Sequence, residues 1–208
     1  MLRTIEADLR SNVDPTRRTG IGFWVWVIGK ALAAPQVHVV VLFRLAHAVA
    51  QTPLRPLAFV IRSIGLVWSG AELHPDAQLA PGLALAHSTG VMIGAHVRTG
   101  VDFRIYPGAV LGEPGRGSAD AAGFPTFGDH VTIGAHAVVL GPIHVGDGSV
   151  VGANSVVTKN VPANVVVAGS PAKVVRHLLP FEEDPTRSIP APKPAPAPAP
   201  TSAPAPVD

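Results

Sequence analysis

An aliphatic or aromatic residue recurs at every sixth position through the middle of this chain. A period of six fits neither the turn of a helix, which takes about 3.6 residues, nor the alternation of an open strand. It fits short strands joined by corners, with each hexad forming one side of a coil, so the repeat predicts a parallel β-solenoid. The downstream members are Phe127, Ile133, Val139, Val145, Val151 and Val157, followed four positions later by Val131, Ala137, Ile143, Ser149, Ser155 and Val161.

The same interval extends upstream with one interruption. Leucines recur at 73, 79 and 85, the phase then slips by two residues, and the series resumes at Ile93, Thr99, Ile105 and Leu111. Three hexads make a triangular coil of 18 residues, so residues 18 apart stack on adjacent coils. Ala135 and Ala153 form such a pair.

The region before the repeat, residues 1–70, is apolar with scattered arginines. Apolar residues at helical spacing predict amphipathic helices that dock on a larger body, with Pro53 and Pro56 separating two of them. The longest apolar stretch without charge lies between Lys30 and Arg44 and is shorter than the roughly 20 residues that span a bilayer. The helical positions are Leu42, Leu45, Ala46 and Val49, then Leu57, Val60, Ile61 and Ile64.

The region after the repeat alternates proline with alanine from about Glu182 onward. This pattern has no apolar periodicity with which to form a core, so an extended, disordered tail is expected. It serves either as a passive solubilising tail or as a recognition peptide for a proline-binding partner. The predicted organisation is a helical region over 1–70, a mainly β solenoid over 71–176, and the tail over 177–208.

The composition excludes several kinds of chemistry. The 208 residues include no cysteine, which excludes disulfides, thiolate metal sites and an acyl-cysteine intermediate. The nine histidines are scattered without metal-ligand spacing, so no metal site is predicted. A formal net charge of +2 gives no dense basic face for nucleic acid. Acidic residues at positions 6 and 8, with no cleavable apolar segment after them, favour a cytoplasmic protein.

Two irregularities in the repeat are candidates for function. His87 lies where the phase slips, and a histidine displaced from regular packing is a candidate general base at neutral pH, although a lone histidine is more often structural. The segment from Gly112 to Pro125 breaks the period altogether. It is either a lid or binding arm or a tolerated insertion, and its composition does not decide between them.

Several motifs together resemble the serine O-acetyltransferase family of hexapeptide acyltransferases, over about Val67 to Arg176. The short N-terminal region, with its Phe43-Arg44-Leu45-Ala46-His47-Ala48 segment, is also similar to colanic acid and exopolysaccharide acetyltransferases. The motifs are Glu72-Leu73-His74-Pro75, Ala86-His87-Ser88-Thr89-Gly90, Leu111-Gly112, Ile133-Gly134-Ala135, Val151-Gly152-Ala153-Asn154-Ser155 and Ala168-Gly169-Ser170-Pro171-Ala172-Lys173.

The resemblance implies a left-handed parallel β-helix that uses acetyl-CoA to acetylate a hydroxyl group. His87 corresponds to the family's catalytic base, and Glu72 to the acidic residue, usually aspartate, that orients it. CoA would lie in a groove between neighbouring solenoids of a homotrimer or a dimer of trimers. The residues implied in CoA binding are Gly112, Ala135, Ala153, Lys159 and Lys173.

The acceptor side departs from the family pattern. Ala86 stands where serine acetyltransferases carry an acidic group that meets the amino acid, and Phe124 stands where they commonly carry a second histidine. These departures leave the acceptor open, and we consider three hypotheses. The first, which follows the family resemblance, is O-acetylation of L-serine in cysteine biosynthesis. The second is O-acetylation of a sugar hydroxyl in exopolysaccharide or envelope glycan assembly, with residues 23–64 resting at a membrane surface. The third is a non-catalytic solenoid scaffold.

Overall fold

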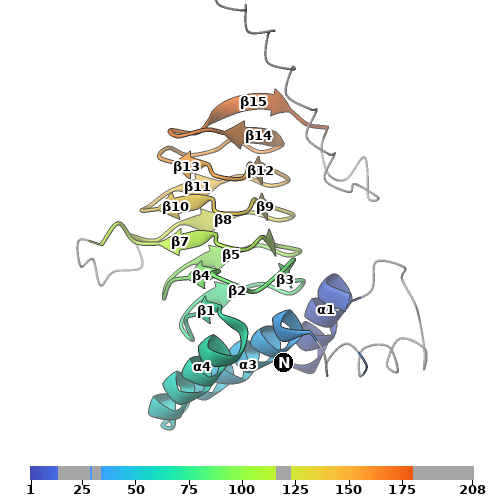
Figure 1. Cartoon of the computed structure of the whole chain (residues 1–208), viewed down its shortest axis with the longest axis vertical. Coiled ribbons are helices and arrows are strands. Elements are labelled where there is room, and N and C mark those ends of the chain that lie inside the picture. The colour runs from blue at the N-terminus through green and yellow to red at the C-terminus, as the bar shows by residue number, and fades with distance from the viewer. Residues whose placement is uncertain (14–28, 30–33, 116–122, 180–208) are drawn as a thin grey trace, which may run out of the picture.

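The computed structural model describes residues 1–13, 29, 34–115 and 123–179. It shows a β-helix of stacked triangular coils, with three helices gathered at its N-terminal end (Figure 1). The predicted left-handed parallel β-helix is confirmed. The strands are β1 (Glu72–Leu73), β2 (Gln78–Leu79), β3 (Ala84–Leu85), β4 (Met92–Ile93), β5 (Arg98–Thr99), β6 (Arg104–Ile105), β7 (Val110–Gly112), β8 (Thr126–Phe127), β9 (Thr132–Ile133), β10 (Val138–Leu140), β11 (His144–Val145), β12 (Val150–Val151), β13 (Val156–Val157), β14 (Val165–Ala168) and β15 (Lys173–His177).

The strands form three sheets, one on each side of the triangle, and all their pairings are parallel except that of β14 with β15. Sheet A has the order β1-β4-β7-β10-β13, sheet B the order β11-β8-β5-β2, and sheet C the order β15-β14-β12-β9-β6-β3. We call the turns that lead from sheet C to sheet A the C–A corner, and those that lead from sheet A to sheet B the A–B corner. These two corners border the same face of the molecule, the outer face of sheet A.

The register confirms the predicted coil length and both irregularities. Val138 pairs with Val156, eighteen residues later, as a coil of three hexads requires. Glu72 pairs with Met92, twenty residues later, because the two-residue phase slip lengthens this coil. Val110 pairs with Val138, twenty-eight residues later, because the insertion lies between them.

The hexad residues fill the interior of the coil. Each one is the second residue of its strand. All of them are buried, including the polar residue Thr99. The small and branched residues four positions later in the downstream series are buried as well. Their hydroxyls have partners: Ser149 Oγ donates to the Pro162 carbonyl at 2.6 Å. Burial of one apolar side chain per hexad explains why a six-residue period is the dominant sequence signal.

The two helices predicted from apolar spacing are present as α3 (Pro35–Ala50) and α4 (Arg55–Ser69), and a further helix, α1 (Leu2–Val13), precedes them. Helix α4 ends where Gly70 adopts a positive φ of 70°, two residues before β1. None of the described helices is long and apolar enough to cross a bilayer.

The faces used for helix packing differ from the prediction in part. Ala46, Ala58 and Ile61 are buried between α3 and α4. The predicted docking residues Leu45, Leu57, Val60 and Ile64 are exposed instead. The two helices pack through small residues, which bring their axes close and turn these larger side chains outward.

Helix α1 is fixed to the first coil by a buried ion pair. Asp8 is fully buried and accepts hydrogen bonds from Arg44 Nε of α3 at 2.7 Å and from the backbone N–H groups of Gly82 and Leu83 at 2.9 Å. Arg44 also donates to the carbonyl of Ala80 at 2.9 Å. Because all these groups are satisfied, the helices and the β-helix are joined in a defined orientation.

Several sequence predictions fall outside the described residues. These are the proline-alanine tail from residue 180 onward, the centre of the insertion at 116–122, and most of the apolar run over 23–33. The last described strand, β15, runs antiparallel to β14 and closes the C-terminal end of the β-helix (Figure 1).

Candidate active site

The C–A corner carries a column of stacked turns. Its backbone hydrogen bonds run from Gly90 N to the Gly70 carbonyl at 2.8 Å, from Gly108 N to Thr89 at 3.0 Å, from His136 N to Pro107 at 2.9 Å and from Asn154 N to Ala135 at 2.8 Å. The positive-φ residues of this column are Gly70, Gly90, Gly108, His136 and Asn154. The turns of the corner therefore share their last residues and hydrogen-bond pattern, including the turn of His87, which is two residues longer than the others.

His87 lies on this column together with two of the residues implied in CoA binding. His87, Ala135 and Ala153 each stand two residues after the buried hexad residue of a sheet C strand. The predicted stacking of Ala135 and Ala153 is confirmed. His87 and Ala153 are exposed, and Ala135 is half-buried. The corner also carries a second exposed imidazole, that of His136, and the turn between His87 and Ala135 holds Tyr106 and Pro107.

The turn of His87 is anchored although the His87 side chain is exposed. The next residue, Ser88, is buried, and its Oγ donates to the Ser69 carbonyl at 2.7 Å. This bond ties the lengthened turn to the end of α4, immediately before β1. Sequence reasoning did not single out Ser88. Its position could have identified Ser88 as a functional residue, because it lies at the phase slip and directly follows the candidate catalytic histidine.

Glu72, the predicted partner of His87, opens β1 on the outer face of sheet A. The Gly90 to Gly70 hydrogen bond brings the turns of His87 and Glu72 onto the same corner. Within the described residues, however, the Glu72 carboxylate forms its ion pair with Arg62 of α4 rather than with His87. The structure therefore places the two residues on one corner without the hydrogen bond that the resemblance implies.

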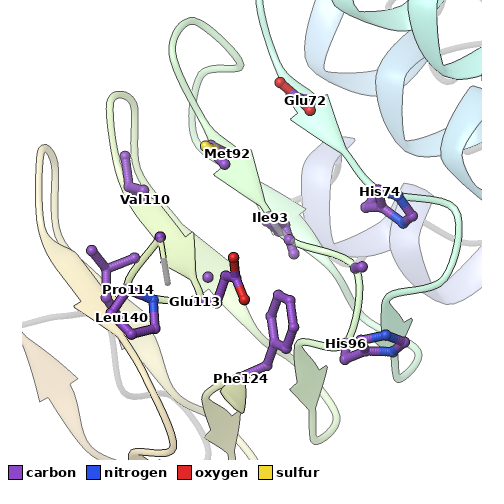
Figure 2. A pocket seen from close by; sticks show the side chains of 14 residues that line it. Glu72, His74, Met92, Ile93, His96, Val110, Glu113, Pro114, Phe124 and Leu140 are labelled. Carbon is purple, nitrogen blue, oxygen red and sulfur yellow. The ribbon is translucent and has the colours of Figure 1, made fainter. Parts of the chain in front are cut away.

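A pocket of about 770 Å³ lies on the outer face of sheet A beside the A–B corner (Figure 2). This volume falls in the range typical of small-molecule sites, roughly 300–1,000 Å³. Its walls are apolar and its polar side chains are few. The apolar side chains come from Met92, Ile93, Val110, Phe124 and Leu140, and the polar ones from Glu72, His74, His96 and Glu113.

Phe124 forms one wall of this pocket and depends on a glycine. A Cβ at Gly94 would lie 3.0 Å from Cε1 of Phe124 and 3.3 Å from the Gly112 Cα, so only glycine leaves room for the ring. The Phe124 ring also meets His96 edge to face, with the ring centroids 5.1 Å apart. The side chain at position 124 thus closes the pocket as a buried apolar ring, where the family resemblance led us to look for a second histidine.

His74 lines the same pocket from the first coil. Burial lowers the pKa of His74 below the usual value of 6.5, and this effect outweighs the opposite influence of the Asp76 carboxylate; Arg62 lowers it further. The ring is held by a hydrogen bond from the Asp76 N–H to Nδ1 at 3.2 Å. His74 is therefore a neutral hydrogen-bonding group at neutral pH.

The other residues implied in CoA binding divide between the two corners. Gly112 lines the pocket at the A–B corner, and a Cβ at this position would meet only Leu140 Cδ2, at 3.8 Å. Lys159 follows β13 on the same corner, whereas Lys173 opens β15 beside Ala168 at the C–A end. Both lysines are exposed. The structure therefore does not gather the five residues on one edge of a single chain.

Comparison with known proteins decides the family. The family model described as bacterial transferase hexapeptide (six repeats) matches residues 124–159. A serine acetyltransferase of Mycobacterium tuberculosis is 41% identical over 187 residues, which cover 89% of this chain and 78% of that protein. The chain belongs to the serine acetyltransferase family.

Further serine acetyltransferases agree in sequence and in structure. The protein of Helicobacter pylori strain 26695 is 38% identical over 69% of this chain and 83% of its own length. The Neisseria gonorrhoeae serine acetyltransferase solved with serine has a TM-score of 0.73 at 30% identity, covering 84% of this chain and 69% of that one. The Brucella abortus serine acetyltransferase solved with coenzyme A has a TM-score of 0.76 at 30% identity, covering 86% and 68%.

Membership in the serine acetyltransferase family makes this protein an acyltransferase. Among the described residues, no group of three or more histidine, aspartate or glutamate side chains is placed to hold a metal ion. The chemistry available to the site is that of imidazole, carboxylate and backbone groups around a pocket and a corner.

Proposed function

We propose that this protein transfers an acetyl group from acetyl-CoA to the hydroxyl of L-serine, with His87 as the general base. The observation that carries the proposal is the position of His87. It is exposed on an anchored turn, in one column with the small residues Ala135 and Ala153, in a chain of the serine acetyltransferase family. The product would be O-acetylserine, a precursor in cysteine biosynthesis, and we place the reaction in the cytoplasm.

The proposed roles follow from the chemistry of each group. The His87 imidazole takes the proton from the acceptor hydroxyl as its oxygen bonds to the acetyl carbonyl carbon, and returns the proton to the departing sulfur when the carbon–sulfur bond breaks. Acetyl-CoA supplies the acyl group in activated, thioester form. Glu72 would stabilise the charged imidazolium once its carboxylate turns from Arg62 toward His87.

The C–A corner fits a slender ligand. Ala135, Ala153 and several glycines lie along it, and glycine is required inside the stack because a Cβ at Gly134 would lie 2.5 Å from Ala153 N. The outer surface therefore stays narrow and its main chain accessible, as a pantetheine arm requires. Lys173 at the C-terminal end of the same corner is suited to contact phosphate groups, and Lys159 would do so from a neighbouring subunit.

We propose a trimer as the active assembly. The outward residues of sheet A are largely apolar, with Met92 41% exposed and Val110, Val138 and Val156 half-buried, whereas sheet B presents polar side chains. Packing of this face against a second copy would bring the C–A corner of one chain to the A–B corner of the next. The divided set of predicted CoA residues supports this arrangement. We propose the trimer itself, or two trimers joined through the helices.

The test is release of free CoA from acetyl-CoA in the presence of L-serine. Wild-type protein should turn over, and His87→Ala should lose about 10²- to 10⁴-fold in kcat, the usual contribution of a general base. His177→Ala, at an exposed histidine at the end of β15, is the matched control and should keep full activity. Unchanged turnover in His87→Ala would remove His87 from the mechanism, and absence of any thioester consumption would favour a scaffold.

A sugar hydroxyl is the second candidate acceptor. The size of the pocket and the aromatic ring of Phe124 on its wall favour it, because sugar rings pack against aromatic faces. The same assay with a panel of sugars in place of serine separates the two. A higher kcat/KM for any sugar than for L-serine would replace the first candidate by the second.

A further inference from the structure

The pocket at the A–B corner contains a carboxylate oxygen that is unpaired among the described residues. Glu113 directly follows Gly112 at the start of the insertion, and its side chain lines the pocket. Its Oε2 atom is fully buried and has no hydrogen-bond partner among the described residues. Figure 2 shows the carboxylate pointing into the pocket, near the Phe124 ring.

Such an atom is unusual, because a buried polar group without a partner costs free energy. The other groups that line the pocket do not relieve this cost. They include no lysine or arginine, and the pKa of His74 is lowered, which favours its neutral form. The walls near Glu113 are Phe124, Gly94 and Leu140, which offer no donor side chain. Among the described residues, Glu113 Oε2 therefore has no cationic or hydrogen-bond-donating partner, and a ligand could supply one.

The chemistry of the site indicates which kind of ligand group could pair with the Glu113 carboxylate. A metal ion would need further acidic or histidine ligands around Glu113, and the described residues provide no such group. A hydroxyl can donate one hydrogen bond but brings no charge. An ammonium group provides both the charge and several donors, and charge-assisted hydrogen bonds are the stronger ones.

We propose that Glu113 binds the ammonium group of an α-amino acid acceptor, and so determines the acceptor specificity of the enzyme. The inference rests on the proposed function, and it accounts for the acidic group that position 86 lacks. Ala86 offers no charge where the family resemblance implies an acidic group, and Glu113 supplies a carboxylate from a different element. Serine would then be bound between two chains of the proposed trimer, with its hydroxyl at His87 on the C–A corner of one chain and its ammonium group at Glu113 on the A–B corner of the next.

The test combines one substitution with one substrate analogue. Glu113→Gln keeps the size and hydrogen-bonding capacity of the side chain and removes its charge. Acetylation of L-serine is compared with that of 3-hydroxypropionate, which lacks the ammonium group. Wild-type protein should prefer serine. In Glu113→Gln, kcat/KM for serine should fall about 10- to 100-fold, mainly through KM, while the value for 3-hydroxypropionate stays unchanged.

Two controls separate recognition from structure. Glu6→Gln, in an exposed ion pair with Arg10 on α1, should change neither substrate. The KM for acetyl-CoA should be the same in Glu113→Gln as in wild type. The melting temperature should not fall, because removal of a buried unpaired charge relieves a cost in free energy, whereas loss of a merely structural contact would lower it.

The outcomes are distinct. Equal losses with both acceptors, or an unchanged preference for serine, would overturn the role of Glu113 while leaving serine acetylation intact. Wild-type protein that acetylates sugars and not serine would overturn the proposed function and the inference together. A loss confined to the ammonium-bearing substrate supports both.

Discussion

The two corners that border sheet A are built in opposite ways. The C–A corner is nearly regular: one hydrogen-bond pattern runs along its turns, which carry His87, Ala135 and Ala153 in a single column, and only the turn of His87 is lengthened, by two residues. The A–B corner is interrupted: the insertion leaves it between β7 and β8, and Glu113 and Phe124 stand at the two ends of that insertion. The difference suggests a division of labour. In our proposal, the repeat carries the catalytic base and the binding path of the acyl donor. The insertion carries the residues that select the acceptor.

The largest expected effect concerns the C–A corner. Ala153→Trp places a bulky ring beside Ala135, in the proposed binding path of acetyl-CoA. The steric cost of about 1–3 kcal/mol should raise the KM for acetyl-CoA about 10- to 100-fold. Steady-state kinetics with varied acetyl-CoA measures this. Ala163→Trp, an exposed alanine on the third corner, is the control and should leave the KM unchanged. Equal KM values in the two variants would mean that the donor does not use the C–A corner.

A smaller effect is expected at the A–B corner. Gly94→Ala pushes the Phe124 ring out of its place, since the new Cβ would lie 3.0 Å from that ring. We expect kcat/KM for the acceptor to fall about fivefold, which corresponds to roughly 1 kcal/mol, with no change in the KM for acetyl-CoA.

The double variant Gly94→Ala with Phe124→Leu sharpens this prediction. If the absence of a side chain at Gly94 is what leaves room for the Phe124 ring, the loss of kcat/KM in the double variant should be smaller than the sum of the two separate losses in free energy. Additive losses, or a rise in the KM for acetyl-CoA, would contradict the separation of the two corners.

A third prediction concerns the support behind His87. Asn12 of α1 donates to the Leu83 carbonyl at 2.6 Å and accepts from Leu85 N at 2.8 Å, so its amide pairs with β3 as a neighbouring strand would. Asn12→Ala should lower the free energy of unfolding by about 1–2 kcal/mol and lower kcat about threefold. Urea unfolding and initial rates measure the two effects. The KM for serine should not change, because the pocket lies at the other corner.

The smallest expected effect is a pH dependence that originates at His74. Its pKa is lowered on folding, so between that value and 6.5 the unfolded chain binds more protons than the native one. Stability is therefore unaffected by this group above pH 6.5 and falls as the pH decreases through that range, by at most about 1.4 kcal/mol per pH unit. Urea titrations from pH 7.5 to about 5 should show a shallower decline in His74→Gln. Parallel curves for the two proteins would refute the assignment.

The sequence predicted the β-helix well because each hexad contributes one inward side chain and one corner, so the period is a direct consequence of burial. The phase slip at His87 was informative for the same reason: two extra residues cannot enter the interior, and they lengthen a turn at the surface. The helices were predicted from their spacing, but Leu57 and Val60 proved exposed, because spacing alone does not say that alanines bring α3 and α4 together.

The candidate site was only partly predictable. His87, Ala135 and Ala153 follow from the repeat, because residues 18 apart must stack. The ion pair of Glu72 with Arg62 could not be foreseen, since Arg62 reaches it from a helix whose orientation depends on tertiary packing. Glu113 was passed over because it lies in an insertion without periodicity. Only the structure shows that one of its oxygens is buried without a partner among the described residues.

The reversed direction of β15 has a consequence for the solubility of the molecule. A column of parallel coils presents at its last rung an open ladder of amide and carbonyl groups, to which a further rung from another molecule could add without limit. Because β15 runs antiparallel to β14 and carries Lys173, Arg176 and His177, an incoming coil meets reversed polarity and positive charge. Addition of a further parallel coil at this end of the column is thereby disfavoured.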